Sequence, residues 1–380
     1  MGVLSGLRVI EIEAIGPAPF AGMMLADHGA EVLRIDRVTE SGLGIAAADA
    51  ARDPLARGKR SVAFDLKRGE GVEAALKLIA RADALIEGFR PGVMERLGLG
   101  PETCLKRNPK LVYGRMTGYG QSGPLAPRAG HDIDYIALAG ALAAIGPRDR
   151  PVPPLNLIGD FGGGGMVLAF GVAAALLSVA RGGKGQVVDA SMVEGAALLT
   201  AFLHGLKAMG LWNENRAANL LDGGAPFYDA YRTKDGKFLA VGAIEPKFYA
   251  ELIEKLGLGG ATLPGQMDRA RWPELKQRIA AAIATRSRAE WEAIFDGSDA
   301  CVAPVLTMTE APAHPHNAAR KNFVSAFGVV QPAPAPRFAA SPGAIAGPPR
   351  PAGADTRKAL TDWGFGVKEI DALIASGAAR

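Results

Sequence analysis

Hydrophobic residues in the first 120 positions come in short runs that alternate with amphipathic stretches. The runs have the length and composition of buried strands and lie at residues 7–13, 31–36, 61–66, 82–89 and 111–120. Helical spacing of apolar residues separates several of them, as at 20–29 and 71–82. This alternation predicts an α/β fold with a Rossmann-like large domain, in which helices cover a parallel sheet.

Further helices are predicted in the middle of the chain. The spacing favours a helix over 132–145, an apolar helix over 165–181, and a strand that runs into a long helix over 185–210. The apolar stretch 166–180 is shorter than the roughly 20 residues that a membrane span requires. We therefore predict a buried helix there and no membrane partner.

The pattern changes near residue 220. Two short strands flank a Lys-Asp-Gly turn at 234–236, and helical stretches follow, which indicates a smaller α+β domain. Many prolines in 331–353 exclude a regular helix or central strand, so this segment is expected to cross the surface in extended form. The predicted parts are a large domain (1–205), a small domain (220–320), and a return segment whose closing helix joins the large domain (321–380).

Composition narrows the class of partner. The 43 Lys and Arg residues against 39 Asp and Glu leave a formal charge of +4, and no basic helix is interleaved with aromatic residues, which argues against nucleic acid. Cys104 and Cys301 lie far apart without metal or redox spacing. Together with an N-terminus that lacks the pattern of an export signal, they favour a reducing, cytoplasmic location.

The stretch AGHDIDY places a histidine beside two carboxylates. Gly130 interrupts the chain before His131, and apolar residues follow at Ile133, Ile136 and Ala137, so His131 is expected in or just before a first helical turn. The positive end of a helix disfavours imidazolium and would keep the ring able to accept a proton. The same position also suits a histidine that merely caps or packs.

Two further acids resemble helix-start residues. Asp160 stands in GDFGGGG before an apolar helix, where it is either an ordinary N-cap or part of a site. Four consecutive glycines exceed what a cap needs, and they suggest that a ligand approaches the main chain there. Glu245 follows a strand of the small domain and precedes a proline, so it is either a plain first-turn glutamate or a third candidate.

Basic residues concentrate in the first hundred positions, several of them at predicted strand ends. As a set they suit a phosphorylated ligand, although a solvated face explains any single one; they are Arg34, Arg37, Lys59, Arg60, Lys67, Arg68, Arg90 and Arg96. A nicotinamide site is disfavoured because the first turn lacks G-x-G-x-x-G and because Pro17 and Pro19 have no amide donor. His-Pro-His at 314–316 lacks a visible third ligand, so no metal site is predicted.

Longer motifs carry a family resemblance from residue 4 to about 365. The chain resembles the α-methylacyl-CoA racemases of the family III CoA-transferase superfamily in GLRVIEIEAIGPAPFAGMMLADHGAEVLRIDR, LIEGFRPGVMERLGLGPE, RMTGYGQSGP, AGHDIDYIALAG, PPLNLIGDFGGGGM, GKGQVVDASMVEG and LDGGAPFYDAYRTKDGKFLAVGAIEPKFYAEL. The resemblance implies a Rossmann-like large domain, a smaller α+β domain and an interlocked homodimer. In this family the active sites lie between the large domain of one subunit and the small domain of its partner.

The implied activity is inversion of the methyl-bearing carbon of 2-methylacyl-CoA thioesters through an enolate. No metal or redox cofactor is implied, and coenzyme A enters only as part of the substrate. By this resemblance His131 and Asp160 exchange protons with the two faces of the carbon, and Glu245 orients the histidine. The backbone N–H of Asp132 is expected to meet the enolate oxygen.

The same matching predicts the residues that line the CoA site. They are Arg37, Ala63, Phe64, Asp65, Leu66, Lys67, Gly88, Phe89, Arg90, Pro91, Gly92, Arg96, Gly130, His131, Asp132, Ile133, Asp134 and Tyr135. Two alternatives stay open: a CoA-transferase of the superfamily with Asp160 as nucleophile, and a CoA-binding protein without turnover. The preferred acyl chain does not follow from the sequence.

Overall fold

The computed structural model describes residues 2–39 and 49–380; residues 1 and 40–48, within the predicted large domain, lie outside the described part. The chain forms two compact units. The first contains residues 1–139, 155–200 and 318–380, and the second contains residues 140–154 and 201–317. Each unit is described by itself.

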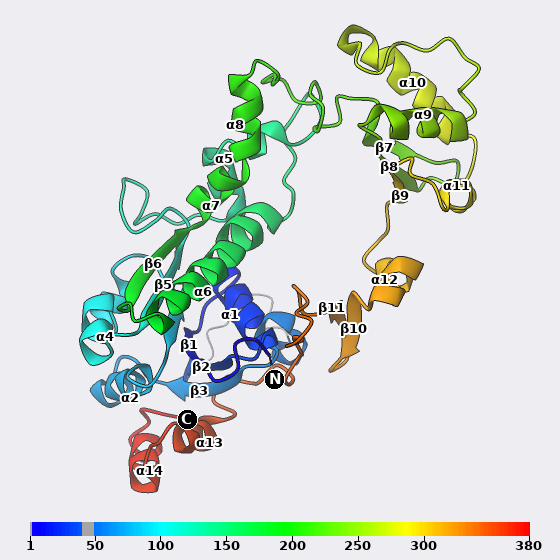
Figure 1. Ribbon diagram of the computed structural model, residues 1–380. Helices are drawn as coiled ribbons and strands as arrows, with labels where there is room; N and C mark the ends of the chain where they lie inside the picture. Colours follow the sequence, from blue (N-terminus) through cyan, green and yellow to red (C-terminus); the bar gives the residue numbers. More distant parts are fainter. Residues whose placement is uncertain (1, 40–48) are drawn as a thin grey trace. The chain divides into compact units, whose positions relative to one another are not determined.

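A six-stranded parallel sheet forms the centre of the first unit (Figure 1). Its strands are β1 (Arg8–Ile12), β2 (Glu31–Arg37), β3 (Arg60–Phe64), β4 (Ala84–Glu87), β5 (Val112–Thr117) and β6 (Gln186–Ser191). Their order is β3-β2-β1-β4-β5-β6, and all neighbouring pairs run parallel. The predicted Rossmann-like α/β class is confirmed.

Alternation along the strands produces two apolar faces. Ile10, Leu33 and Leu85 point into one core, which is covered by α2 (Gly69–Ile79), α4 (Pro101–Arg107), α13 (Thr356–Asp362) and α14 (Val367–Ala375). Val9 and Val32 point into the other core, which is covered by α1 (Pro17–Asp27) and α6 (Val167–Ala180). Because side chains alternate with a period of two, a strand buried on both faces must be apolar at nearly every position. This explains the short continuous apolar runs of the sequence.

Helices of the first unit follow the strands closely. They are α1 (Pro17–Asp27), α2 (Gly69–Ile79), α3 (Val93–Arg96), α4 (Pro101–Arg107), α5 (Asp132–Leu138), η5 (a π-helix, Leu157–Met166), α6 (Val167–Ala180), α7 (Met192–Leu199), α13 (Thr356–Asp362) and α14 (Val367–Ala375). A short helix, α12 (Pro315–Arg320), precedes the hairpin of β10 (Phe323–Ala326) and β11 (Val329–Pro332).

The second unit contains a small antiparallel sheet of order β7-β8-β9 beside helices. Its elements are α8 (Ala201–Ala208), β7 (Tyr228–Arg232), β8 (Phe238–Gly242), α9 (Pro246–Lys255), α10 (Trp272–Ile283), α11 (Arg288–Phe295) and β9 (Val302–Pro304). The strands flanking the Lys-Asp-Gly turn are as predicted, with Gly236 at a φ of +78°. The α+β character is therefore confirmed.

Two predicted helices are shorter than expected. The helix predicted over 132–145 ends at Leu138, because Gly140 takes a φ of +81° that no helix contains. The long helix predicted to follow the strand within 185–210 breaks at Thr200, whose hydroxyl donates to the carbonyl of Ala197 (2.8 Å). Both breaks fall where the chain passes between the two units.

The proline-rich segment (331–353) ends strand β11 with its first two residues and then returns along the first unit without a helix or central strand, as predicted. It is held by backbone contacts at Ala344, whose N–H donates to the carbonyl of Asp27, and at Gly347, whose carbonyl accepts from Gly58. Arg57 also holds the segment in place. It forms a buried ion pair with Asp27 and donates a hydrogen bond to Gln331 at the start of the segment (2.8 Å).

The predicted buried apolar helix is buried on one side only. In the described part of the chain, one helix, Leu157–Ala180, is both long enough and apolar enough to cross a membrane, judged by length and composition alone. In its most apolar window, 39% is buried inside the protein. Leu168 and Val172 face the sheet, whereas Phe170 is 76% exposed. The exposed side leaves an apolar surface that needs an explanation.

Candidate active site at the carboxyl edge of the sheet

The carboxyl ends of the six strands meet at one edge of the sheet. In the observed order, β1 and β4 are neighbours and their following loops lead away in opposite directions, which makes this the place where open α/β sheets bind ligands. Gly16 follows β1 with a φ of +76°, and Gly88 follows β4. A Cβ at Gly88 would lie 3.0 Å from the Cβ of Ala14, so the two loops pass closely.

His131 occupies the predicted place at the start of a helix. It is the N-cap of α5, its side chain is exposed, and its own N–H donates to the Asp134 carboxylate (2.9 Å). The first amides of the helix, including that of Asp132, have no partner within the helix. An exposed imidazole and the first amides of a helix therefore lie side by side.

Tyr135 fixes the loop that carries His131. Its ring is buried at 5.0 Å from the ring of Tyr119, and its hydroxyl donates to the carbonyl of Gly130. A Cβ at Gly118 or Gly130 would collide with this ring, which explains glycine at both positions. Burial raises the pKa of Tyr135 to about 12, so its hydroxyl remains a donor at neutral pH.

Asp160 lies inside a helix and not at its start. The residue that precedes the π-helix is Asn156, and Asp160 is the fourth residue of η5, so the N-cap alternative is wrong. A Cβ at Gly16 would lie 3.5 Å from Oδ2 of Asp160. The carboxyl group is therefore placed beside the loop that follows β1.

The four glycines after Asp160 pack against protein and not against a ligand. A Cβ at Gly163 would lie 2.6 Å from the amide of Ala196 in α7, and one at Gly165 would lie 2.7 Å from the carbonyl of Pro17 in α1. Seen from α7, a Cβ at Gly195 would overlap the carbonyl of Gly163. The suggestion that the glycines expose main chain to a ligand is corrected: they let three helices approach one another closely.

The surroundings of Asp160 favour its protonated form. Burial raises the pKa of this carboxyl, and the nearby charge of Asp132 raises it further. A hydrogen bond from the Asn156 amide (3.2 Å) and the charge of His131 act in the opposite direction. His131 and Asp160 are thus close enough to influence each other electrostatically.

One contact of the site has no sequence signal. The buried side chain of Asp132 accepts a hydrogen bond from the backbone N–H of Asp160 (2.7 Å), across 28 positions of sequence. Asp132 was predicted through its backbone amide, and nothing in the spacing indicates where its carboxylate points. Asn156 was not predicted for the same reason.

Glu245, the third predicted acid, belongs to the second unit. It is the N-cap of α9, is exposed, and precedes Pro246 at the first helical position, as the sequence indicates. Its relation to His131 stays a prediction.

The GFRPG turn (88–92) is anchored by a buried acid that the sequence analysis did not single out. Glu87, at the end of β4, accepts from the N–H of Phe89 (2.7 Å) and from Arg115 (2.9 Å). Arg115 in turn pairs with Glu95 of α3 (2.8 Å). Burial raises the pKa of Glu87 to about 7. The turn and the helix bearing Arg96 are thus tied to β5, while Arg90 and Arg96 remain exposed.

Other predicted CoA-site residues differ in accessibility. Arg37, at the end of β2, is about half exposed and lies 3.8 Å from Glu13. Ala63 and Phe64 are buried, and the N–H and carbonyl of Ala63 bond to Thr356 (3.2 Å) and Arg380 (3.1 Å). C-terminal residues thus occupy the strand end, whereas Lys67 beyond it is exposed.

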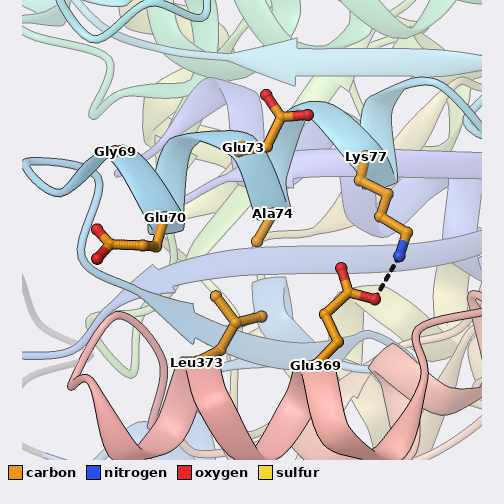
Figure 2. A pocket seen from close by; sticks show the side chains of 7 residues that line it. All are labelled: Gly69, Glu70, Glu73, Ala74, Lys77, Glu369 and Leu373. Carbon is orange, nitrogen blue, oxygen red and sulfur yellow. Dashed lines mark hydrogen bonds and ion pairs between the residues drawn. The ribbon is translucent and has the colours of Figure 1, made fainter.

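A separate hollow of about 460 Å³ lies between α2 and α14 (Figure 2). Glu70 and Glu73 line one side, and Lys77 is paired with Glu369 (2.5 Å). Its acidic lining would repel phosphate groups, so it does not suit the anionic ligand that the basic residues indicate. Over residues 2–39 and 49–380, no group of three His, Cys, Asp or Glu side chains is placed to hold a metal ion.

Fold and site together define a member of the CoA-transferase family III, and the chain belongs to that family, whose model matches residues 4–356. It is 50% identical over 371 residues to alpha-methylacyl-CoA racemase of Mus musculus and 47% identical over 370 residues to the enzyme of that name from Homo sapiens. Each match covers 97% of this chain and 95% of the relative.

Solved structures agree with the fold. The crystal structure of Rv3272 from M. tuberculosis superposes with a TM-score of 0.77 at 28% identity, covering 94% of this chain and 98% of that one. A CAIB/BAIF family protein from Brucella suis gives a TM-score of 0.79 at 24% identity, covering 95% and 99%. The predicted family and fold are confirmed.

The glycine packing generates a stability prediction. We expect Gly195→Ala to lower the free energy of unfolding by roughly 1–3 kcal/mol, because the added methyl forces η5 and α7 apart. Urea unfolding measures this change. Gly205→Ala is the matched control, since Gly205 in α8 has open space around its Cβ position. That control should be neutral or stabilising, and a Gly195→Ala protein as stable as the wild type would contradict the packing argument.

Proposed function

We propose that this protein is a racemase that inverts the α-carbon of 2-methylacyl-CoA thioesters by two-base proton transfer. The observation that carries the proposal is that His131 at the start of α5 lies near enough to Asp160 for their charges to interact, while the N–H of Asp160 bonds to Asp132 of the same helix start. The relatives named alpha-methylacyl-CoA racemase, 50% and 47% identical over nearly the whole chain, support it.

The chemistry requires two groups that flank one carbon. One group takes the α-proton, the electrons of the C–H bond form the double bond of the enolate, and the carbonyl electrons move to oxygen. A proton delivered to the opposite face then restores the carbonyl with inverted configuration. Asp160 suits the donor role because burial and the charge of Asp132 raise its pKa and so favour the protonated form, and His131 suits the acceptor role. The roles exchange for the other enantiomer.

Enolate charge needs hydrogen-bond donors that are already in place. The N–H of Asp132 starts α5, directly after His131. At this position it would meet the thioester oxygen with little reorganisation, which is the usual basis of oxyanion stabilisation. The histidine and the donor come from adjacent residues, so a single helix start positions both.

Coenzyme A would be held by the basic residues of the same edge. Arg37, Arg90 and Arg96 are exposed there and provide forks for phosphate oxygens. The tie from Glu87 and Arg115 holds the GFRPG turn and α3 in fixed positions. Coenzyme A is then part of the substrate and not a resident cofactor.

The first catalytic prediction concerns the two central residues. We expect His131→Ala and Asp160→Ala each to reduce racemisation by roughly 10²–10⁴, the usual contribution of a positioned acid or base. The measurement is deuterium incorporation at the α-carbon of a 2-methylacyl-CoA in deuterated water. His314→Ala and Asp189→Ala are the matched controls, because they remove a histidine and an aspartate that lie outside the proposed site.

Each alternative function has its own outcome in this assay. Acyl exchange onto a free acid without α-deuteration would favour a transferase with Asp160 as nucleophile. Tight acyl-CoA binding without either reaction would favour a binding protein. Full activity of either alanine variant would remove that residue from its role.

The second prediction separates binding from chemistry. Arg96→Ala and Arg37→Ala should raise KM for the acyl-CoA while leaving kcat nearly unchanged. In the proposal, these arginines bind the coenzyme A part of the substrate and not the reacting carbon. Steady-state kinetics with one racemic substrate measures both constants. Arg107→Ala is the control, because Arg107 is exposed on α4 and pairs with Glu73 (2.7 Å). An unchanged KM would exclude the substituted arginine from the site.

We also propose that two copies form the interlocked homodimer that the sequence predicts. The supporting observation is the apolar outer surface of η5, α6 and α7, where Met166, Phe170, Leu177, Leu198 and Leu199 are all more than half exposed. An exposed apolar surface of this kind often marks a protein–protein interface. In such a dimer, Glu245 of one subunit would belong to an active site that contains His131 of the other subunit. A cytoplasmic location stays a prediction.

Sedimentation velocity tests the dimer. The wild type should sediment at twice the mass of one chain, and Phe170→Glu should shift it towards the monomer because the substitution places a charge in the apolar surface. Val367→Glu, at an equally exposed position on α14, should leave the mass unchanged. A wild-type monomer at micromolar concentration would contradict the proposal.

A further inference from the structure

The carboxylate of Asp132 differs from the other buried acids of the first unit. Glu11, Asp27 and Glu87 each have both oxygens engaged: Glu11 by Lys59, Asp27 by Arg57, and Glu87 by Arg115 and an amide. Asp132 is only 7% exposed. Its Oδ2 accepts one amide, and its Oδ1 has no partner among the described residues.

A buried carboxylate oxygen without a hydrogen-bond partner lowers the stability of the fold, so such an oxygen often has a functional role. No lysine or arginine neutralises this one within the described residues. What lies against it is Asp160, the residue to which the proposed function gives a proton-transfer role. The arrangement therefore keeps a negative charge beside a second carboxyl group.

The amide that donates to Asp132 is one of those that have no partner inside the π-helix. The first bond of the π-helix runs from the N–H of Phe161 to the carbonyl of Asn156 (3.3 Å), so the N–H of Asp160 precedes the helical ladder. Asp132 supplies the missing acceptor at 2.7 Å. Gly159 permits the approach, because a Cβ there would lie 2.6 Å from Oδ2 of Asp132.

We propose that the side chain of Asp132 is a positioning residue for the reaction: it fixes the helical turn that carries Asp160 and places a negative charge beside the Asp160 carboxyl. The proposal rests on the proposed function, in which Asp160 must be able to hold a proton. After burial, the charge of Asp132 is the factor that raises the pKa of Asp160. Asp132 thus acts through Asp160 and needs no contact with the α-carbon.

Charged groups on the other elements that pack against η5 have different partners. Glu194 of α7 accepts from Ser191, Arg115 of β5 pairs with Glu87 and Glu95, and Asp189 of β6 accepts from the N–H of Gln121 (3.3 Å). On α1 the acid is Asp27, which pairs with Arg57. Among the described residues, the charges that shift the pKa of Asp160 are those on α5: His131 at its N-cap and Asp132 in its first turn.

Two substitutions separate position from charge. Asp132→Asn keeps an oxygen for the Asp160 amide and removes the charge, so the limb of the kcat/KM profile that reports Asp160 should move to lower pH. Asp132→Ala removes the bond as well, and kcat should fall by roughly 10²-fold through misplacement of Asp160, with KM little changed. Asp189→Asn is the control, because it alters another carboxylate that accepts one backbone amide.

A titration that does not depend on turnover completes the test. NMR of ¹³C-carboxyl-labelled aspartate, with Asp160 assigned through Asp160→Asn, should show a lower Asp160 titration midpoint in Asp132→Asn than in the wild type. An unchanged midpoint together with an unchanged pH profile would overturn the proposal, even if Asp132→Ala failed to fold. Absence of turnover in the wild type would count against the proposed function alone, since the titration still decides the role of Asp132.

Discussion

The close packing of backbone between η5, α7 and α1 is the constraint on which the site depends. Gly163 and Gly195 bring two helices so near that neither position tolerates a Cβ, and Gly165 does the same against Pro17. Because α1 begins at the loop after β1 and α7 follows β6, these contacts tie the π-helix to the segments that follow a central strand and the edge strand of the sheet. Asp160 is thereby held beside Gly16, at the edge where the strands end.

The edge of the sheet has two chemically different parts. The loops after β1 and β4 diverge where the two strands are neighbours, and Asp160, bonded through its amide to Asp132, lies beside Gly16 of the loop after β1. Exposed basic residues follow β2 and β4, at Arg37, Arg90 and Arg96. A long anionic ligand with one reactive carbon fits such a division, because its charged handle and its reacting end require opposite surroundings.

Much of the fold follows from residue patterns, and the limits have physical causes. Continuous apolar runs such as 31–36 predict buried parallel strands, and the glycine before His131 predicts a helix start; the structure has both. The GDFGGGG stretch misleads, because a close approach to main chain is equally useful for a ligand and for another helix. Periodicity cannot tell which of the two fills the space, and it does not distinguish a π-helix from an α-helix.

Contacts between distant positions set the second limit. The bond from the Asp160 amide to Asp132 and the anchoring of the GFRPG turn by Glu87 and Arg115 join residues on different elements. Neither contact has a local signature in the sequence. An aspartate in the first turn of a helix, such as Asp132, is common simply because the helix dipole favours negative charge there. The Glu245 and dimer predictions are of the same kind, because contacts between subunits would have no local signature in the sequence either.

Two-base racemisation sets an electrostatic requirement that explains the unusual setting of Asp132. A carboxyl and an imidazole can exchange roles only if their proton affinities are similar, and an ordinary aspartate lies more than two pKa units below histidine. Burial closes part of that gap, but burial alone would leave the carboxyl sensitive to small motions of its surroundings. A fixed charge on the neighbouring helix start raises the proton affinity of Asp160 by a mechanism tied to position, and the same bond that carries the charge also sets the position. In the proposed mechanism the unpaired oxygen of Asp132 therefore lies where its charge assists proton transfer, whereas other buried carboxylates of the first unit, such as Glu11 and Asp27, are fully paired.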